Sequence, residues 1–473
     1  MFEAIGGLFT GIVAIALVLG ACIFFHEVGH FVLAKLVGMR VHEFAIGFGK
    51  RIVGFTRGDT EYRINWVPLG GYVRIAGMEP GAEPEPGGFY TFPRWQGATV
   101  LFAGSLMNVV LAALAFIVVA LATGLPVFPS DQVDIRRVMS GSPAQEAGLQ
   151  QGDRIVAIDG MRHSLLISEV EEGGTADELG IMRYDRFFMV EGTQVSTVPN
   201  LVAALNEARD DEADTNGVEI DLLRFTEEGT IAERWQAELT IPEELPEEVS
   251  VADAGLAIEE AFDLTLVPMG TEEALSHISA RPEQEIALTV LRNEQEIEVT
   301  VVPEREWARV PVEEDGRISS AHESVGRIGV VLGAQTRPAS GAEAVYYGIQ
   351  GSVDAVKMVS QGIYMMIRGQ LAPEASGPVG IAAMTADRAR IGWTAVASLG
   401  GIISANLAVI NLFPIPPFDG FRIVLLGVEG VIRRRVNQKI ETAVTIIGVA
   451  LLLGLFLIIT FRDILNLVFF QTP

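Results

Sequence analysis

Two histidines and a glutamate stand close together near the start of the chain, in the sequence His26-Glu27-Val28-Gly29-His30. In a helix, histidines at positions i and i+4 project from the same face, so both imidazoles can bind one tetrahedral metal ion. The intervening Glu27 is then able to take a proton from a water molecule at that ion. The spacing predicts a metal site with Glu27 as its catalytic general base.

The surroundings of this motif make it more specific than its five residues alone. It follows an almost purely apolar run that begins near Leu8 and is long enough to cross roughly 30 Å of hydrocarbon. One ionisable side chain near the centre of a bilayer costs about 2.5 to 3.5 kcal/mol on insertion scales. Two histidines and a glutamate in one such helix therefore indicate a functional site.

A catalytic zinc site has a third protein ligand and a fourth position left open. The candidate third ligand is Asp419, in the segment Asn411-Leu412-Phe413-Pro414-Ile415-Pro416-Pro417-Phe418-Asp419-Gly420. Its prolines remove backbone donors and end a helix, and broken backbone at membrane depth is tolerated only where it lines protein or a wet cavity. We expect Asp419 to join the two histidines; the alternative is an ordinary turn residue that ends a helix.

Water must reach such a site, and two asparagines are the polar residues best suited to line its pocket. Asn108 and Asn411 both stand in apolar stretches. We expect both to line this pocket as candidate substrate-binding residues; the alternative for each is a hydrogen bond between helices.

The composition fits a membrane protein that also carries soluble domains. Of 473 residues 49% are hydrophobic, yet the net charge is -26. Four stretches are long enough to span a bilayer, near Leu8 to Leu36, Ala98 to Leu125, Trp393 to Phe413 and Ala443 to Phe461. The single cysteine, Cys22, excludes internal disulfides. We therefore predict a polytopic α-helical membrane protein with four transmembrane helices.

Basic residues in the short loops predict the orientation. The first loop holds Lys35, Arg40, Lys50, Arg51, Arg57, Arg63, Arg74 and Arg94, and the loop after the third span holds Arg422, Arg433, Arg434, Arg435 and Lys439. Both loops are expected on the cytoplasmic side, with both termini and the long middle segment outside. In this orientation His26 and Asp419 both lie near the cytoplasmic ends of their spans.

The first loop also contains β-forming stretches. Tyr62 to Val67 and Tyr72 to Ile75, joined through Pro68-Leu69-Gly70-Gly71, predict a hairpin. An exposed edge of such a hairpin could add a strand of unwound substrate and satisfy its backbone groups, with Gly70, Gly71, Tyr72 and Val73 as the contacting residues. A purely structural hairpin is the alternative.

The middle segment, about Pro129 to Gln335, carries most of the acidic residues, which argues against binding to nucleic acid. It opens with a pattern that resembles a PDZ domain, Gly148 to Gly160 preceded by Val133 to Ala144. A second such opening follows at Leu179 to Asp185 and has its own helix and strands. The elements that the first copy lacks are found at Glu272 to Ala280, Glu285 to Leu291 and Glu296 to Val301.

This order predicts one PDZ-like domain inserted into another. The expected parts are a membrane core at 1–128, an outer domain at 130–163 plus 246–303, an inserted domain at 164–245, a linker with an interfacial helix at 304–392, and a second membrane core at 393–473. Two tandem domains followed by an unrelated hairpin are the alternative.

The motifs together resemble the site-2 protease family of intramembrane zinc metalloproteases, and within it the bacterial regulator of sigma-E proteases. Besides the histidine motif and the Asp419 segment, the resemblance rests on Gly70-Gly71-Tyr72-Val73, Gly104-Ser105-Leu106-Met107-Asn108 and Gly377-Pro378-Val379-Gly380. The chain departs from the family at Phe421-Arg422, where Gly-His is common, and at Ser105, where Pro is common.

The resemblance implies Zn²⁺ bound by His26, His30 and Asp419, with Glu27 as general base. It favours substrate contact for Asn411. It implies regulated intramembrane proteolysis in a bacterial stress response, with an anti-sigma factor or a remnant signal peptide as the single-span membrane substrate. It also implies a multi-pass protein of the bacterial inner membrane, with PDZ domains in the periplasm that filter substrates. An intramembrane metal transporter and a non-catalytic PDZ scaffold are the competing classes.

Overall fold

The computed structural model describes residues 2–78, 85–127, 133–195, 197–211, 218–225, 231–239, 241, 245, 250, 253–314, 317–334, 336–371 and 377–469. The chain divides into two compact units, which are described separately. One contains Met1–Gly124, Pro311–Ser320 and Pro338–Pro473, and the other contains Leu125–Val310 and Ala321–Arg337.

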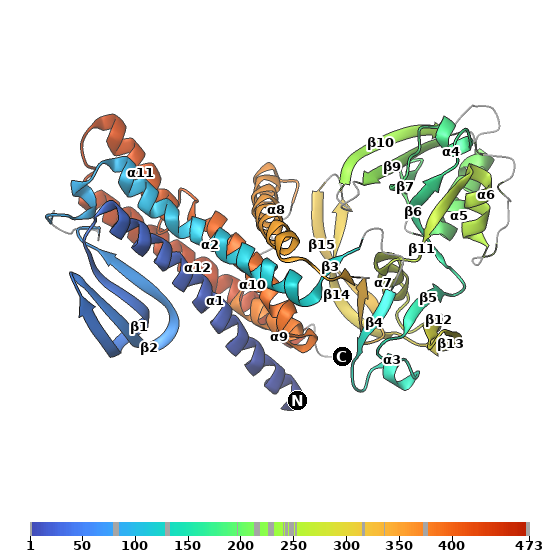
Figure 1. Cartoon of the computed structure of the whole chain (residues 1–473), viewed down its shortest axis with the longest axis horizontal. Helices are drawn as coiled ribbons and strands as arrows, with labels where there is room; N and C mark the ends of the chain where they lie inside the picture. Colours follow the sequence, from blue (N-terminus) through green and yellow to red (C-terminus); the bar gives the residue numbers. More distant parts are fainter. Residues whose placement is uncertain are drawn as a thin grey trace. The chain divides into compact units, whose positions relative to one another are not determined.

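The first unit is built on long apolar helices that run side by side (Figure 1). Its helices are α1 (Phe2–Val37), α2 (Arg94–Thr123), α8 (Gly341–Arg368), α9 (Pro378–Ile391), α10 (Trp393–Asn411), α11 (Asp419–Ile432) and α12 (Gln438–Phe469), with a short 3-10 helix at Phe89–Thr91. Within the described residues, four of them contain stretches long and apolar enough to cross a membrane: Gly11–Val37, Arg94–Thr123, Trp393–Asn411 and Lys439–Asp463. The prediction of four such helices is confirmed.

Helices α1 and α2 approach each other closely because glycines face the contact. A Cβ atom added to Gly29 of α1 would lie 2.2 Å from the carbonyl oxygen of Ala103 on α2. At the other end of α1, a Cβ on Gly11 would lie 2.3 Å from the carbonyl oxygen of Ala382 on α9. Small residues at helix contacts let backbones approach closely in membranes, so these glycines determine how α1 packs.

Helix α8 begins in a capping box, in which the Ser340 side chain accepts from the Glu343 amide and Glu343 accepts from the Ser340 amide. It packs against α2 and α10, where Gly348 lies against Ile117 and Ala355 is buried. It is not one of the four candidate spans. It lies within residues 304–392, where a helix was expected after the soluble segment, and its interfacial position stays a prediction.

The predicted hairpin in the first loop is wrong. Residues 62–67 and 72–75 both belong to one long strand, β2 (Thr60–Ile75), and the hairpin is formed by β2 with β1 (Val41–Arg57) across Gly58 and Asp59. Gly70, with a φ of 80°, lets the chain pass irregularly through β2 without reversing. The β1 strand was not expected because three glycines and Lys50-Arg51 interrupt its pattern.

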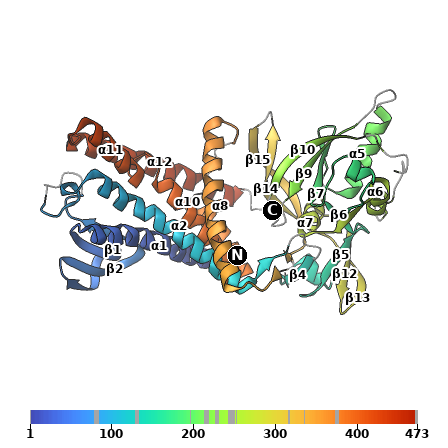
Figure 2. The same cartoon turned by 45° about the horizontal axis from the view of Figure 1, so that its top comes forward.

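Strand β1 contacts two separate stretches of β2. Phe44 pairs with both Val73 and Tyr62, so residues 43–46 lie between residues 71–74 and 61–64. The sheet lies beside the C-terminal part of α1 (Figure 2), and α1 contacts β2 extensively. Phe31 of α1 packs its ring 4.8 Å from that of Phe44.

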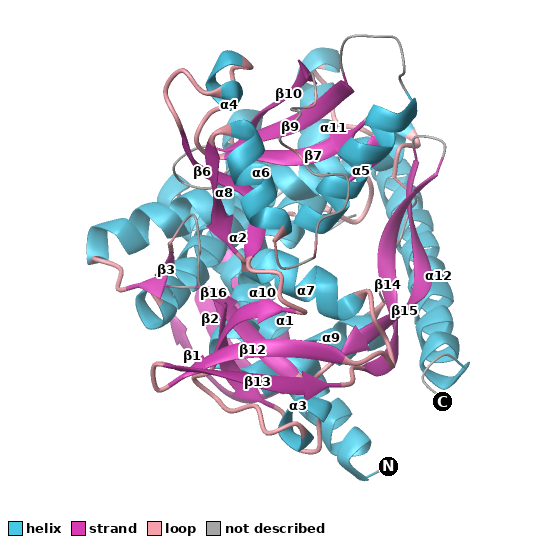
Figure 3. Cartoon of the chain, turned by 90° about the vertical axis from the view of Figure 1, so that its right-hand side faces the viewer, coloured by secondary structure: helices cyan, strands magenta, loops and turns pink. Residues whose placement is uncertain are grey.

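The second unit contains two antiparallel sheets (Figure 3). One has the order β13-β12-β5-β4-β16, with β4 (Val133–Val138), β5 (Arg154–Ile158), β12 (Ile286–Arg292), β13 (Gln295–Val301) and β16 (Val330–Ala334). The other has the order β10-β9-β7-β6-β11, with β6 (His163–Val170), β7 (Asp185–Val190), β9 (Val218–Phe225), β10 (Ile231–Leu239) and β11 (Leu264–Pro268), and β8 (Thr193–Gln194) beside β7.

Short helices and a hairpin complete this part of the chain. The helices are α3 (Pro143–Glu146), α4 (Thr175–Glu178), α5 (Val198–Asp211), α6 (Ala254–Phe262) and α7 (Thr271–Ser279). Strands β14 (Glu304–Glu314) and β15 (Arg317–Arg327) pair with each other, as do β3 (Leu125–Pro126) and β17 (Thr336–Arg337). Each of the two larger sheets has its own hydrophobic core.

The nested order requires that strands far apart in sequence pair, and they do. Leu288 of β12 pairs with Ile158 of β5, with the whole second sheet between them in sequence. Two predicted boundaries are wrong. Helix α6 and strand β11 pack in the core of the predicted inserted domain, which therefore extends to residue 268 and not to 245. Strand β16, which lies in the predicted linker, pairs with β4 and completes the sheet of the predicted outer domain. Acidic runs around both segments concealed their apolar residues.

Candidate functional site

His26, His30 and Asp419 come together in the first unit. His26 Nε2 lies 3.0 Å from His30 Nε2 and 3.0 Å from Asp419 Oδ2, and His30 Nε2 lies 3.2 Å from the same oxygen. The two histidines are buried, and the Asp419 side chain is 16% exposed. Among the described residues, these three form the one cluster of His, Cys, Asp or Glu side chains close enough to hold a metal ion.

The second nitrogen of each ring has its own partner. His30 Nδ1 lies 2.8 Å from the carbonyl oxygen of Val100 on α2, so Nδ1 carries the proton and donates it to that oxygen. The unprotonated Nε2 then has a free electron pair with which it can bind a metal. His26 Nδ1 lies 3.5 Å from the side-chain amide of Asn108 and 3.4 Å from that of Asn411. Each contact fixes the direction in which the Nε2 atom points.

Gly104 of α2 makes room for both rings. A Cβ atom at this position would lie 2.6 Å from His26 Cε1 and 2.6 Å from His30 Nε2. The sequence showed this glycine only as part of a second-span motif, and its contact with both rings depends on how α1 packs on α2. It is a site residue that sequence reasoning missed.

Asp419 reaches the site from the start of α11. Helix α10 ends at Asn411, and the chain turns through the proline-containing segment before α11 begins at Asp419. Gly420 is required next, because a Cβ there would lie 2.1 Å from the carbonyl oxygen of Leu412. The prolines therefore end one helix and start the next with Asp419 at its first turn.

Glu27 is held from the side of the β sheet. Its Oε2 accepts a hydrogen bond of 2.9 Å from the backbone amide of Val73 on β2. The Oε1 atom has no such partner among the described residues, and Glu27 lines the cavity at the site. The sequence predicted both residues at the site, but nothing in it indicated that they touch.

A cavity of about 390 Å³ surrounds these groups. It is lined by Ile23, His26, Glu27, His30, Tyr72, Val73, Met78, Asn108, Leu407, Asn411, Pro417, Phe418, Asp419 and Arg422. Of the residues expected to contact substrate, Asn108, Asn411, Tyr72 and Val73 therefore lie at the cavity.

Gly70 and Gly71 do not line the cavity. Gly70 packs against Ile23, and Gly71 lies against the carbonyl oxygen of Ala45 in the sheet. Arg422, one of the positions that departs from the family pattern, lies in the cavity wall, which the sequence had not indicated.

Comparison with known proteins agrees with this geometry. The profile of Peptidase family M50 matches residues 14–455. The chain belongs to peptidase family M50. The resemblance to the site-2 proteases is thereby confirmed, and a peptidase is favoured over the transporter and the scaffold.

Similar proteins of bacteria match over nearly their whole length. A putative zinc metalloprotease of Thermotoga maritima is 27% identical over 96% of this chain and 98% of its own. The zinc metalloprotease RasP of Geobacillus kaustophilus is 29% identical over 96% and 97%. The regulator of sigma-W protease RasP of Bacillus subtilis is 27% identical over 96% and 98%. Together with the four apolar helices, the family assignment makes this a multi-pass membrane metalloprotease.

Proposed function

We propose that this chain is a zinc metalloprotease that hydrolyses a peptide bond inside the membrane-spanning segment of a single-span protein. The observation that carries the proposal is the cluster of His26, His30 and Asp419 beside Glu27, on helices that are long and apolar enough to span a bilayer. The family and the names of the relatives support the same chemistry.

The donor set fits zinc. A tetrahedron with bonds of about 2.0 to 2.1 Å has edges of roughly 3.3 to 3.4 Å. The three potential donor atoms are separated by 3.0, 3.0 and 3.2 Å, so they already form a face of nearly that size. Two imidazoles and one carboxylate are typical ligands of catalytic zinc sites. When bound, zinc polarises a peptide carbonyl and lowers the pKa of water.

The residues of the chain have distinct tasks in this proposal. Glu27 takes a proton from the attacking water and delivers it to the leaving nitrogen. The Val73 amide orients the Glu27 carboxylate. The amides of Asn108 and Asn411 orient His26, since an imidazole that binds a metal usually donates its other N–H to a neighbouring acceptor and an amide can present its oxygen to Nδ1.

An intramembrane protease must unwind its helical substrate and satisfy the freed backbone groups. The outer edge of residues 71–75 suits this task, because the Val73 amide faces the site, whereas the Ala76 amide bonds back to Arg40. Amides alternate along a strand, so those of Gly71 and Ile75 are on the same side as Val73. We infer that a stretch of substrate adds to this edge.

The single cysteine makes the edge testable by disulfide formation. Cys22 is buried, and a Cys22→Ala, Glu27→Gln background should leave the substrate uncut. Tyr72→Cys in that background should crosslink to a cysteine near the scissile bond of the substrate. Phe55→Cys, on an exposed part of the same sheet, is the matched control. Equal crosslinking at both positions would count against edge addition.

The basic residues in the first loop and in the loop after the third span predict how the chain is oriented in the membrane. They favour an inner membrane protein with the site toward the cytoplasm and the second unit in the periplasm. Protease accessibility of the second unit in spheroplasts tests this orientation.

A repeated ion pair supports two related modules in the second unit. Asp153 accepts from the Gln150 amide and pairs with Arg292, which also bonds the Gly148 carbonyl. In the inserted part, Asp185 accepts from the Met182 amide and pairs with Arg224, which also bonds the Gly180 carbonyl. The same contacts at the same offsets, with the same strand order in both sheets, favour one PDZ-like domain nested in another.

We propose that these modules filter substrates. Deletion of residues 125–337, which takes the whole of the second unit together with Pro311–Ser320 of the first, should then permit cleavage of a substrate that keeps its bulky outer domain. The matched control is the same substrate already trimmed, which both proteins should cleave. A deleted protein that cleaves the trimmed substrate but not the untrimmed one would oppose the filter.

The substrate class is a single-span anti-sigma factor or a remnant signal peptide. The test is to reconstitute the protein in vesicles with such a substrate and to locate the cut by mass spectrometry. A cut within the apolar segment is expected. Zinc flux without cleavage would favour a transporter, and substrate binding with neither would favour a scaffold.

A further inference from the structure

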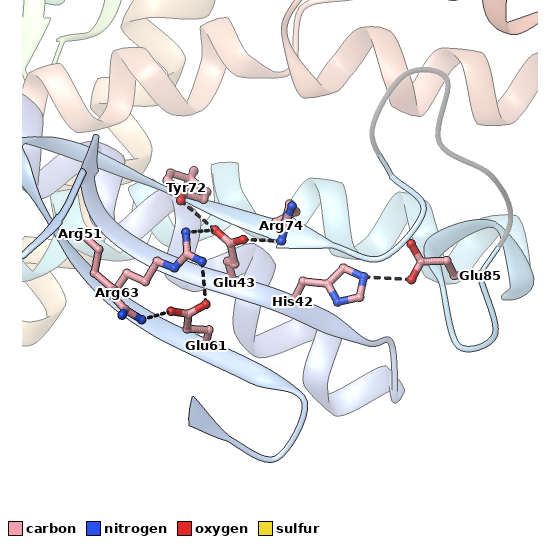
Figure 4. A network of polar contacts seen from close by, with 8 residues as sticks. All are labelled: His42, Glu43, Arg51, Glu61, Arg63, Tyr72, Arg74 and Glu85. Atoms are coloured by element: carbon pink, nitrogen blue, oxygen red, sulfur yellow. Dashed lines mark hydrogen bonds and ion pairs between the residues drawn. The ribbon is translucent and has the colours of Figure 1, made fainter. Parts of the chain in front are cut away.

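Glu43 is a buried carboxylate that the proposed mechanism does not use. It lies in β1 with 7% of its surface exposed. Its Oε2 accepts a hydrogen bond of 2.9 Å from the Tyr72 hydroxyl and pairs at 2.9 Å with Arg63 Nη1, and its Oε1 pairs with Arg74 (Figure 4). A buried carboxylate is tolerated where its charge is compensated and its oxygens are bonded. Two guanidinium groups and a phenol do both here.

These contacts join the separate stretches of the sheet. In the strand register Glu43 is paired with Arg74 on one side and with Glu61 on the other. The side chain therefore ties residues 71–74 and residues 61–64 of β2 to the β1 segment between them. Without it, the irregular passage of β2 at residues 68–71 would leave the 71–74 stretch less firmly held.

The stretch that Glu43 holds is the wall of the candidate active site. Tyr72 and Val73 line the cavity, and the Val73 amide donates to Glu27 at 2.9 Å. A continuous path thus runs from the Glu43 carboxylate through the Tyr72 hydroxyl and one peptide bond to the carboxylate of Glu27. Misplacing a reacting group by about 1 Å can reduce a rate by roughly 100-fold.

We propose that Glu43 is a positioning residue for the reaction. It holds Tyr72 and Arg74 so that the Val73 amide fixes the Glu27 carboxylate in the direction that proton transfer needs. The proposal rests on the proposed function, because it concerns the rate of that peptide hydrolysis.

Glu61 provides a matched control in the same sheet. Its Oε1 pairs with Arg51 Nη1 at 2.5 Å and its Oε2 with Arg63 Nη2 at 2.6 Å. Among the described residues, no direct contact joins Glu61 to Tyr72 or Arg74. Loss of Glu61 therefore removes two ion pairs of the sheet, one of them to the Arg63 that also contacts Tyr72. It leaves the direct contacts of Glu43 with Tyr72 and Arg74 in place.

The experiment compares Glu43→Ala, Glu43→Gln and Glu61→Ala in the full-length protein, with a single-span substrate and with zinc content measured on the same samples. Glu43→Ala should lower kcat about 10- to 100-fold, change KM by less than about threefold and keep one zinc per chain. Glu43→Gln keeps an oxygen for the Tyr72 hydroxyl and should recover part of the loss. Glu61→Ala should stay within about twofold of the wild type in both constants.

Tyr72→Phe keeps the proposal testable if Glu43→Ala does not fold, because it removes only the hydroxyl contact. It should lower kcat with unchanged zinc content. Four results would each overturn the proposal: equal losses of kcat in the Glu43 and Glu61 variants, a change in KM alone, loss of zinc from Glu43→Ala, or an unchanged kcat. A wild-type protein that does not cleave at all would instead refute the proposed function, so the two failures are distinguishable.

Discussion

Replacement of Gly104 by alanine should damage the site without removing any of its polar groups. The new Cβ would lie 2.6 Å from His26 Cε1 and from His30 Nε2, about 0.8 Å inside the 3.4 Å at which ordinary contact begins. Neither ring can retreat freely, because His30 is tied to Val100 and His26 lies against two asparagine amides. We expect at least one imidazole to move by several tenths of an ångström.

The expected size of the effect follows from that displacement. Disturbing the groups that orient a ligand typically costs about 10- to 100-fold in metal affinity or activity. The assay is zinc content of the purified protein in a series of metal buffers, with cleavage measured on the same samples. The control is Gly454→Ala in α12, where an added Cβ has no atom within 4 Å and alanine favours a helix by about 1 kcal/mol. Zinc affinity and cleavage of Gly104→Ala within twofold of the control would refute the packing argument.

Three further predictions concern other parts of the molecule. Asp419→Ala should lose stoichiometric zinc while its circular dichroism stays unchanged, since it removes one of three ligands; retained zinc would exclude Asp419 as a ligand. Burial, with a smaller contribution from the charge of Arg281, lowers the pKa of His277. Neutral His277 therefore favours the folded state above its unfolded pKa of about 6.5, and this contribution to stability is lost as pH falls. Hydrogen-exchange protection of β12 should drop between pH 7.5 and 5.5 more in wild type than in His277→Gln, and an equal drop would contradict this. Ile328→Ala should destabilise the sheet β13-β12-β5-β4-β16 and its core by about 2 to 5 kcal/mol in urea unfolding, because Ile328 is 2% exposed in that core. An unchanged free energy of unfolding would show that the segment around Ile328 is not part of this core.

The cluster of His26, His30 and Asp419 could be predicted because each of its two segments carries a signal that is local in sequence. The i, i+4 spacing of His26 and His30 fixes both rings on one helix face, and the prolines before Asp419 identify a break at membrane depth. The span lengths and loop charges predict that both segments lie at the same depth. These inferences need no knowledge of how side chains pack.

The contacts that orient the cluster could not be predicted in the same way. The roles of Gly104, the Val100 carbonyl and the Val73 amide depend on the distance between helices and on the course of a strand. The hairpin prediction failed because β1 carries glycines and two basic residues where an alternating apolar pattern is expected, while Gly70 looked like part of a turn. The register of a bent strand is decided by buried contacts such as those of Glu43, which a pattern of residue types does not contain.

The recurrence of similar elements along the chain predicted that strands far apart in sequence would pair, as Leu288 and Ile158 do. The limits of the two sheets were not predicted, since β11 and β16 are short strands that follow acidic segments. Their place is fixed by cross-strand partners more than 90 residues away, such as Leu264 with Val170 and Val330 with Val138.

The central claim is that Glu27 performs proton transfer at a zinc site formed by His26, His30 and Asp419. The most direct test is Glu27→Gln in the purified full-length protein, with zinc content, substrate binding and cleavage of a single-span substrate measured together with the wild type. We predict one zinc per chain and unchanged substrate binding in both proteins, with cleavage by the wild type alone. Cleavage by Glu27→Gln at a rate near that of the wild type would contradict the account.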